Sequence, residues 1–147
     1  MADIFSEVKR SQIMSKISGK ETKPEVLVRK LLFAEGFRFR KNDKRLAGKP
    51  DVVLPKYRTV IFVNGCFWHG HQECKKAALP NTRRDFWEQK ISSNVSRDAR
   101  IIERLQQDGW RVITVWQCQL KNQQEALETL DKTAVSLRAD FKPNSRD

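Results

Sequence analysis

Apolar residues recur with the 3.6-residue spacing of an amphipathic helix in three parts of the chain. These parts are residues 22–36, about 84–108 and 122–139. Gly36 and Gly109 follow the first two and are suited to end a helix. In the second helix we expect a buried stripe made of Trp87, Ile91, Val95, Ile102 and Leu105.

Apolar runs of strand length lie between the helices. A short strand is predicted at 37–40, and two longer ones at 51–54 and 58–63 flank a turn. The run at 58–63 is almost continuously apolar, which favours a central strand covered on both faces, and 110–116 is predicted to be another buried strand. The order α-β-β-β-α-β-α predicts an α/β fold, with a mixed sheet and helices on both of its faces.

The chain length favours one domain with a real hydrophobic core. Residues 1–20 are polar and of mixed charge, and they are predicted to form a flexible arm that contacts the ligand. Residues 21–140 would form the single domain and 141–147 a polar tail. The sequence contains neither internal repeats nor a signal of a second domain.

Charge narrows the class of partner. Lys and Arg number 29 against 18 acidic residues, a formal net charge of +11. Clustered cations gain affinity for nucleic acid by releasing its counterions, so the balance favours a polyanion over a merely soluble basic protein. No apolar run reaches bilayer length and the N-terminus has no signal-peptide core, so we expect a cytoplasmic protein without a membrane partner.

Chemistry is concentrated in residues 62–74, "FVNGCFWHGHQEC", which hold both histidines and two of the three cysteines. In a reducing compartment, cysteines are buried thiols or metal ligands rather than disulfides. Cys66, His71, Cys74 and Cys118 have the composition of a closed structural zinc site. Three inert buried cysteines are the alternative, and His69 falls outside the set.

Two carboxylates and the remaining histidine are candidates for catalysis. Asp51 opens a predicted strand after a basic loop, where hydrolytic nucleases hold Mg²⁺, although for this residue considered alone a turn position is the favoured explanation. Glu25 has the spacing of a capping box with Thr22, which accounts for it without catalysis. His69 can exchange a proton with water near neutral pH, or it can be structural.

Aromatic and basic side chains offer DNA contacts, each with a plainer alternative. Phe67 and Trp68 could form a wedge between base pairs or a plug over the zinc. On the long helix, a phosphate-facing stripe or an ordinary solvated face could be formed by Lys90, Asn94 and Arg97. Asp98 could orient a partner in the site.

Three ordered segments carry a resemblance to a known family. They are "GKPDVVLPKYRTVIFVNGCFWHGHQEC", "TRRDFWEQKISSNVSRD" and "LQQDGWRVITVWQC". Over residues 9–120 the chain resembles the very-short-patch-repair (Vsr) DNA mismatch endonucleases. The resemblance implies a three-layer α/β/α restriction-endonuclease-like fold with a structural zinc. It also implies a monomer that makes an Mg²⁺-dependent nick 5′ of the thymine in a T·G mismatch, the product of 5-methylcytosine deamination, with mismatch-repair proteins as further candidate partners.

The resemblance also implies roles for individual residues. Asp51 would bind the catalytic metal with the backbone carbonyl of Val63, Glu25 would be the second acid, and His69 would assist the water or the phosphate. Structural zinc ligands would be Cys66, His71, Cys74 and Cys118. Phe67 and Trp68, with Met14 from the arm, would intercalate beside the mismatch.

The chain departs from the family pattern in three places. Val63 and Asn64 replace a Thr-His pair, and an amide cannot exchange a proton as an imidazole does. His71 and Cys74 are separated by two residues rather than one. The Glu-x-Lys of broader nuclease relatives is missing after Asp51, so Glu25 would supply the second acid.

Two rival functions stay open at this stage. Asn64 leaves room for a nicking partner of a restriction–modification system that has the same fold but no mismatch specificity. A zinc module that only binds mismatched DNA is the other rival, and the presence of Asp51, Glu25 and His69 argues against it.

Overall fold

The computed structural model describes residues 23–139. Met14 and the predicted arm and tail lie outside this range, so those predictions are not addressed by the structure. The described helices and strands are α2 (Pro24–Ala34), β1 (Arg40–Lys41), β2 (Val52–Leu54), β3 (Thr59–Asn64), α3 (Arg84–Gln107), β4 (Arg111–Trp116) and α4 (Gln123–Ala139). Short 3-10 turns connect them at η1 (Pro55–Tyr57), η2 (Lys75–Ala77) and η3 (Gln117–Leu120).

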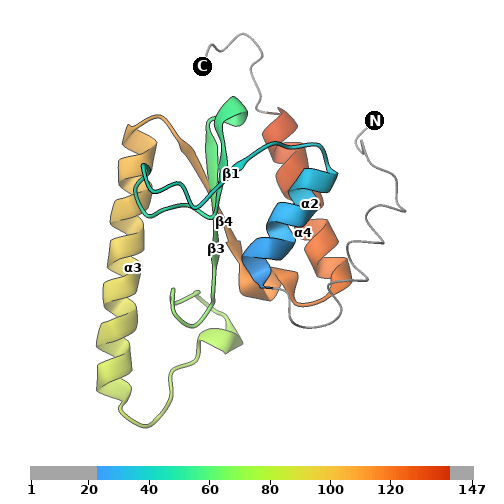
Figure 1. Cartoon of the computed structure of the whole chain (residues 1–147). Helices are drawn as coiled ribbons and strands as arrows, with labels where there is room; N and C mark the ends of the chain where they lie inside the picture. The colour runs from blue at the N-terminus through green and yellow to red at the C-terminus, as the bar shows by residue number, and fades with distance from the viewer. Residues whose placement is uncertain (1–22, 140–147) are drawn as a thin grey trace.

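A four-stranded mixed sheet separates the helices into two groups. Its order is β1-β2-β3-β4, with the first two pairings antiparallel and the pairing of β3 with β4 parallel. The helix α3 covers one face, and α2 and α4 cover the other (Figure 1). The predicted mixed α/β arrangement is therefore confirmed. Among the described helices, none is long and apolar enough to cross a membrane.

Strand periodicity divides the core between the two faces of the sheet. Val52, Leu54 and Ile61 pack in one cluster with apolar residues of α2 and α4. Val53 and Val60 point the other way and pack with Leu105 of α3, because successive side chains of a strand face opposite sides. All five strand side chains are fully buried, so β2 and β3 are covered on both faces, as predicted for the run at 58–63. The buried strand predicted at 110–116 is not borne out to the same degree, because β4 is the last strand in the order of the sheet and only Val115 in it is buried.

Two local predictions need correction, and a third falls partly outside the described residues. The strand predicted at 37–40 is only the two-residue β1, Arg40–Lys41, because Phe37 is buried in the α2 and α4 core and does not join the sheet. Helix α2 has Lys23 as its N-cap, without a side-chain capping hydrogen bond among the described residues, and Thr22 of the predicted capping box lies outside the described range. Val95 is 43% exposed and does not belong to the buried stripe of α3.

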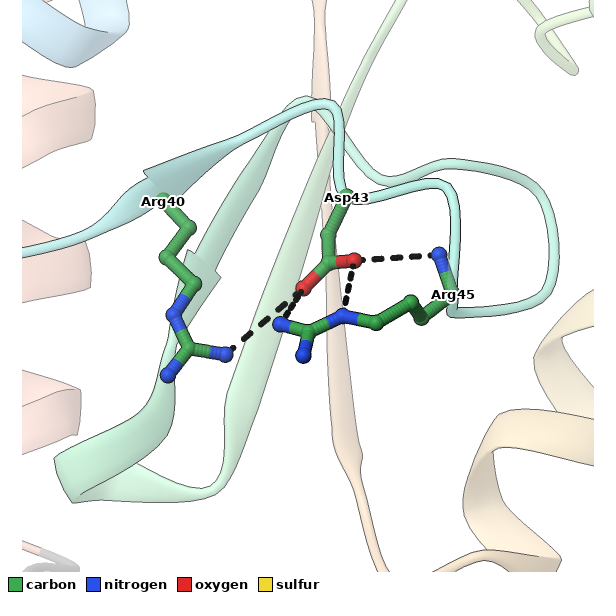
Figure 2. A network of polar contacts seen from close by, with 3 residues as sticks. All are labelled: Arg40, Asp43 and Arg45. Carbon is green, nitrogen blue, oxygen red and sulfur yellow. Dashed lines mark hydrogen bonds and ion pairs between the residues drawn. The ribbon is translucent and has the colours of Figure 1, made fainter.

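The loop between β1 and β2 is ordered by its own contacts. Asp43 accepts hydrogen bonds from the backbone N–H of Arg45 and from its guanidinium, and it also faces Arg40 (Figure 2). The side-chain hydrogen bond from Arg45 lowers the pKa of Asp43 to about 2. Further along, Leu46 and Ala47 pack against the cluster that contains Leu105. The part of the loop around Leu46 and Ala47 therefore packs against α3.

Gly48 should be intolerant of any side chain, because it has a φ of +75° and an added Cβ would lie 2.6 Å from Cγ2 of Ile101. We expect Gly48→Ala to lower the free energy of unfolding by about 1–3 kcal/mol through overpacking and backbone strain. Gly65→Ala is the matched control, since the nearest atom to its added Cβ, Oε1 of Gln117, is an ordinary 3.6 Å away. Urea denaturation measures both, and equal stability of the two variants would contradict the packing seen here.

Candidate active site and metal centre

The parallel pairing of β3 with β4 places two cysteines side by side. Cys66 follows the end of β3, and Cys118 follows the end of β4 at the same edge of the sheet. His71 and Cys74 come from the loop after β3, and the ligand atoms of all four residues lie within 4.8 Å of one another. Three thiols and one imidazole in this space fit a closed, tetrahedral zinc site. The structure thus brings together the four residues predicted to bind zinc.

Contacts around the cluster hold the imidazole in place. The ring of His71 stacks on Trp116, with centroids 4.0 Å apart and planes 7° from parallel. The backbone N–H of His71 donates to the carbonyl of Cys66 at 3.0 Å, and His71 Nδ1 lies 3.5 Å from Sγ of Cys118. The loop is therefore folded back on the strand end in a geometry that presents its ligand atoms to one centre.

The thiols of the cluster differ in their affinity for protons. Burial raises the pKa of Cys118 to about 11, and the neighbouring thiols add to this effect. Burial also pushes the pKa of Cys74 upward, but hydrogen bonds from the Lys76 backbone and the two other thiols outweigh it and lower that pKa. Thiolates this close repel one another unless a cation joins them. Zinc binding at the cluster would therefore release protons.

Asp51 directly precedes β2, and its carboxylate reaches across to the neighbouring strand. Its Oδ2 accepts a hydrogen bond of 2.7 Å from the backbone N–H of Val63 in β3. Burial raises the pKa of Asp51, the Val63 amide opposes this, and the nearby charge of Glu25 raises the pKa further. A half-buried carboxylate beside a second acid is electrostatically suited to a cation.

Helix α2 contributes two charged groups next to Asp51. Glu25 lies in its first turn, and Arg29 follows one helical turn later on the same side. The Nε of Arg29 donates to the backbone carbonyl of Asp51 at 3.2 Å. Sequence reasoning identified Glu25 but missed Arg29, because its contact with Asp51 depends on how α2 packs against the sheet.

His69 pairs with a carboxylate from the long helix. Its Nδ1 lies 2.6 Å from Oδ2 of Asp98, and both side chains are partly buried. Asp98 therefore contacts His69, as a residue that orients a partner would, and its role in a site stays a prediction. A hydrogen bond at Nδ1 fixes the orientation of the ring and leaves Nε2 for other chemistry.

A cavity of about 450 Å³ lies between the sheet and α3. His69 and Asp98 line it together with Asn64, and Lys49 and Arg97 contribute two cations. The position of Lys49 in the wall of this cavity was not predicted from the sequence. The polar walls and paired cations suit a phosphate group.

The predicted phosphate-facing stripe of α3 is incomplete. Lys90 and Arg97 are exposed, but Asn94 is only 7% exposed. Its Nδ2 donates to the carbonyl of Trp68 at 2.9 Å. Asn94 therefore ties the loop after β3 to α3 instead of facing solvent, and its place in the stripe was wrong.

An aromatic patch adjoins the metal loop, formed by Phe67, Trp68, Phe86 and Trp87. Their ring centroids lie 5.0–5.7 Å apart in edge-to-face pairs. Trp68 is 50% exposed and Phe86 44% exposed, so these two rings are not sealed inside a core. Sequence reasoning missed the second pair, although the adjacent Phe86 and Trp87 repeat the Phe-Trp order of the first.

Comparisons with known proteins agree on one family. The family described as "DNA mismatch endonuclease Vsr" matches residues 2–76. The type II nicking enzyme V.NmeAIP of Neisseria meningitidis is 54% identical over 94% of this chain and 98% of its own length. The type II nicking enzyme V.XorIIP of Xanthomonas oryzae pv. oryzae is 47% identical over 83% and 89%. The DNA mismatch endonuclease Vsr of Escherichia coli is 45% identical over 85% and 80%.

The two histidines of the loop give a matched test of the metal centre. His71→Ala should lose bound zinc and melt at a lower temperature, because zinc binding contributes folding energy. His69→Ala should keep its zinc, since His69 lies outside the cluster. Metal content by atomic emission and thermal melting measure both variants. Equal zinc in the two proteins would show that the cluster is not the zinc site.

Proposed function

The chain belongs to the Vsr family of DNA mismatch endonucleases and is a DNA nicking endonuclease, and from this we propose that it hydrolyses one strand of duplex DNA with Mg²⁺ held at Asp51. We propose further that its preferred substrate is a T·G mismatch, nicked 5′ of the thymine. The observation that carries the proposal is the juxtaposition of Asp51, His69 with Asp98, and a cationic cavity.

The residues around Asp51 fit a divalent cation. Among the described residues, the carboxylate accepts one hydrogen bond, from Val63, and burial and Glu25 both raise its pKa. A cation would relieve this cost, and the ligands available to it are Asp51, the Val63 carbonyl and, directly or through water, Glu25. When bound, Mg²⁺ would supply Lewis-acid stabilisation of the phosphate charge and a more acidic water.

The protein's own groups would move the proton and hold the phosphate. His69, oriented by Asp98, would present Nε2 to the water or to the departing 3′ oxygen. Lys49 and Arg97 would bind the phosphate oxygens in the same cavity. Asn64 also lines this cavity, but an amide can only accept or donate a hydrogen bond, so His69 is left as the proton carrier.

The aromatic patch supports mismatch recognition. Trp68 is half exposed and directly precedes His69 in the chain, so a base stacked on it would lie close to the cavity. Inserting an aromatic ring between base pairs costs a few kcal/mol of lost stacking, and less where the pairing is already distorted. A wedge next to the site would therefore favour mismatched DNA. The Trp68 carbonyl is also tied to α3 through Asn94, which keeps the wedge rigid.

The second candidate is a nicking enzyme of a restriction–modification system without mismatch specificity. The names of the relatives at 54% and 47% identity, both type II nicking enzymes, support this second candidate, and so does Asn64, whereas the half-exposed Trp68 beside His69 supports the first. Both candidates use the same site. As for the fold family, the four-stranded mixed sheet with helices on both faces supports the restriction-endonuclease-like architecture.

Cleavage of matched duplexes distinguishes the two candidates. One 5′-labelled duplex carries T·G and the other C·G at the same position, each with and without Mg²⁺. Magnesium is omitted rather than chelated, because a chelator would also compete for the zinc cluster. We expect one Mg²⁺-dependent nick directly 5′ of the mismatched thymine. Equal nicking of both duplexes would instead establish the second candidate.

Asp51→Asn separates metal binding from folding. The amide oxygen can still accept the Val63 hydrogen bond, so the variant should fold and keep zinc but lose nicking. Because burial raises the pKa of Asp51, the folded state prefers the protonated acid, and stability falls as pH rises through that pKa. Without Mg²⁺ at pH 8 the variant should therefore melt at or above the wild-type temperature.

Adding Mg²⁺ should raise the melting temperature of the wild type and leave that of Asp51→Asn unchanged, because binding to the folded state stabilises it. Without Mg²⁺, the difference in melting temperature between Asp51→Asn and the wild type should shrink as the pH is lowered. Nicking by Asp51→Asn, or equal stabilisation of both proteins by Mg²⁺, would overturn the assignment of Asp51.

A further inference from the structure

The strands β1 and β2 form a hairpin whose loop ends at Asp51. Arg40 pairs with Val53 and Lys41 with Val52, so residues 42–51 are the loop, with Asn42 at its start. This loop is longer than a tight hairpin turn and its ends are not fixed by turn geometry. It nevertheless delivers Lys49 to the cavity and Asp51 to the strand edge. Something must hold its two ends at a defined position.

Contacts inside the loop order its middle. Asp43 binds Arg45 through the backbone and the side chain at 2.9–3.0 Å (Figure 2). The glycine at position 48 packs against Ile101 of α3. These contacts fix the loop to itself and to α3. They do not fix the ends of the loop relative to α2, which carries Glu25.

One side chain spans both ends of the loop. The Nε of Arg29 donates to the carbonyl of Asp51 at 3.2 Å, and its Nη2 donates to Oδ1 of Asn42 at 3.3 Å. Asn42 has a φ of +48°, a conformation that asparagine tolerates better than most residues. The planar fork of one guanidinium thus joins α2 to the first and last residues of the loop.

We propose that Arg29 is a positioning residue for the nick, which clamps the ends of the 42–51 loop to α2 and thereby aims the Asp51 carboxylate. This inference rests on the proposed role of Asp51. The backbone of Asp51 is held by Arg29 on one side, and its carboxylate is held by Val63 on the other. Two supports on opposite ends of one residue leave the carboxylate little freedom, and reacting groups displaced by about 1 Å can lose roughly 100-fold in rate.

If Arg29 acts only through its charge, lysine should replace it; if it acts as a clamp, lysine should not. Arg29 also lies close enough to Asp51 for its charge to matter. Lysine keeps the charge, but its single ammonium group on a flexible stem does not reproduce the planar two-point contact. Arg29→Lys therefore tests geometry at constant charge, and Arg29→Met removes both.

The experiment measures single-turnover nicking of the duplex that the wild type cleaves, at saturating Mg²⁺ and over a range of enzyme concentrations. Arg29→Met and Arg29→Lys should each lower the maximum rate roughly 10- to 100-fold. The enzyme concentration that gives half of the maximum rate should stay within about threefold of the wild-type value. Lys30→Met, the exposed neighbour on α2, is the matched control and should behave as wild type. Zinc content and melting temperature are measured for every variant.

The other end of the clamp is tested at Asn42. Asn42→Gly keeps the positive φ but removes the acceptor of Arg29, so it should lower the maximum rate by less than Arg29→Met does. In the double variant, Asn42→Gly should lower the maximum rate no further than Arg29→Met alone, since both changes remove the same contact between Arg29 and Asn42. Asn42→Asp keeps the Oδ1 acceptor and should retain the wild-type rate.

Four results would overturn the clamp: a wild-type rate for Arg29→Met, full activity of Arg29→Lys, an additive double variant, or a loss that lies wholly in DNA affinity. Should Arg29→Met lose zinc or fold poorly, the Asn42 variants decide. Equal rates for Asn42→Gly and wild type would then refute the proposal. Asp51→Ala is run alongside. If it still nicks, the role of Asp51 fails; if it is inactive while Arg29→Met is fully active, only the clamp fails.

Discussion

The parallel pairing of β3 with β4 is the contact on which the rest of the site depends. It ends both strands at one edge, and each strand is followed two residues later by a cysteine, Cys66 and Cys118. The long segment between β3 and α3 buries little of its own, since Cys66 is its one buried residue among those the structure describes. A core cannot hold such a segment, whereas a metal bound by four side chains can. The zinc cluster would therefore be the anchor for the loop that carries the functional side chains.

The proposed catalytic groups come from different layers and have separate supports. Asp51 is held by the sheet and by α2, through Val63 and Arg29. His69 is held by the zinc loop and by α3, through Asp98. In the described part of the chain, the residues that hold Asp51 make no hydrogen bond to His69, and Asp98 makes none to Asp51. The distance between Asp51 and His69 is therefore set by the packing of the sheet against its two helix layers. Damage to the core would therefore reduce activity before it abolished folding.

Sequence reasoning succeeded where the signal is local and failed where it is tertiary. Periodicity alone predicted α3 and α4, and the composition of the loop after β3, together with the one remaining cysteine at 118, identified the four residues that meet at the metal cluster. Asn94 was misjudged, because its burial follows from the carbonyl of Trp68, a backbone group that no pattern in the sequence reveals. Arg29 was missed for the same reason: its partners lie in a loop distant along the chain.

Adjacency in the chain links the proposed base contact to the proposed proton carrier. Trp68 is half exposed in the aromatic patch, and the next residue, His69, faces the cavity through its contact with Asp98. A rigid loop cannot move one without the other, and the Asn94 hydrogen bond together with a metal bound at the cluster would make this loop rigid. A ring that is wrongly seated on well-paired DNA would therefore displace the imidazole from the phosphate. Selection between DNA substrates would then act on the rate of the chemical step and not only on binding, which is where discrimination contributes most to specificity.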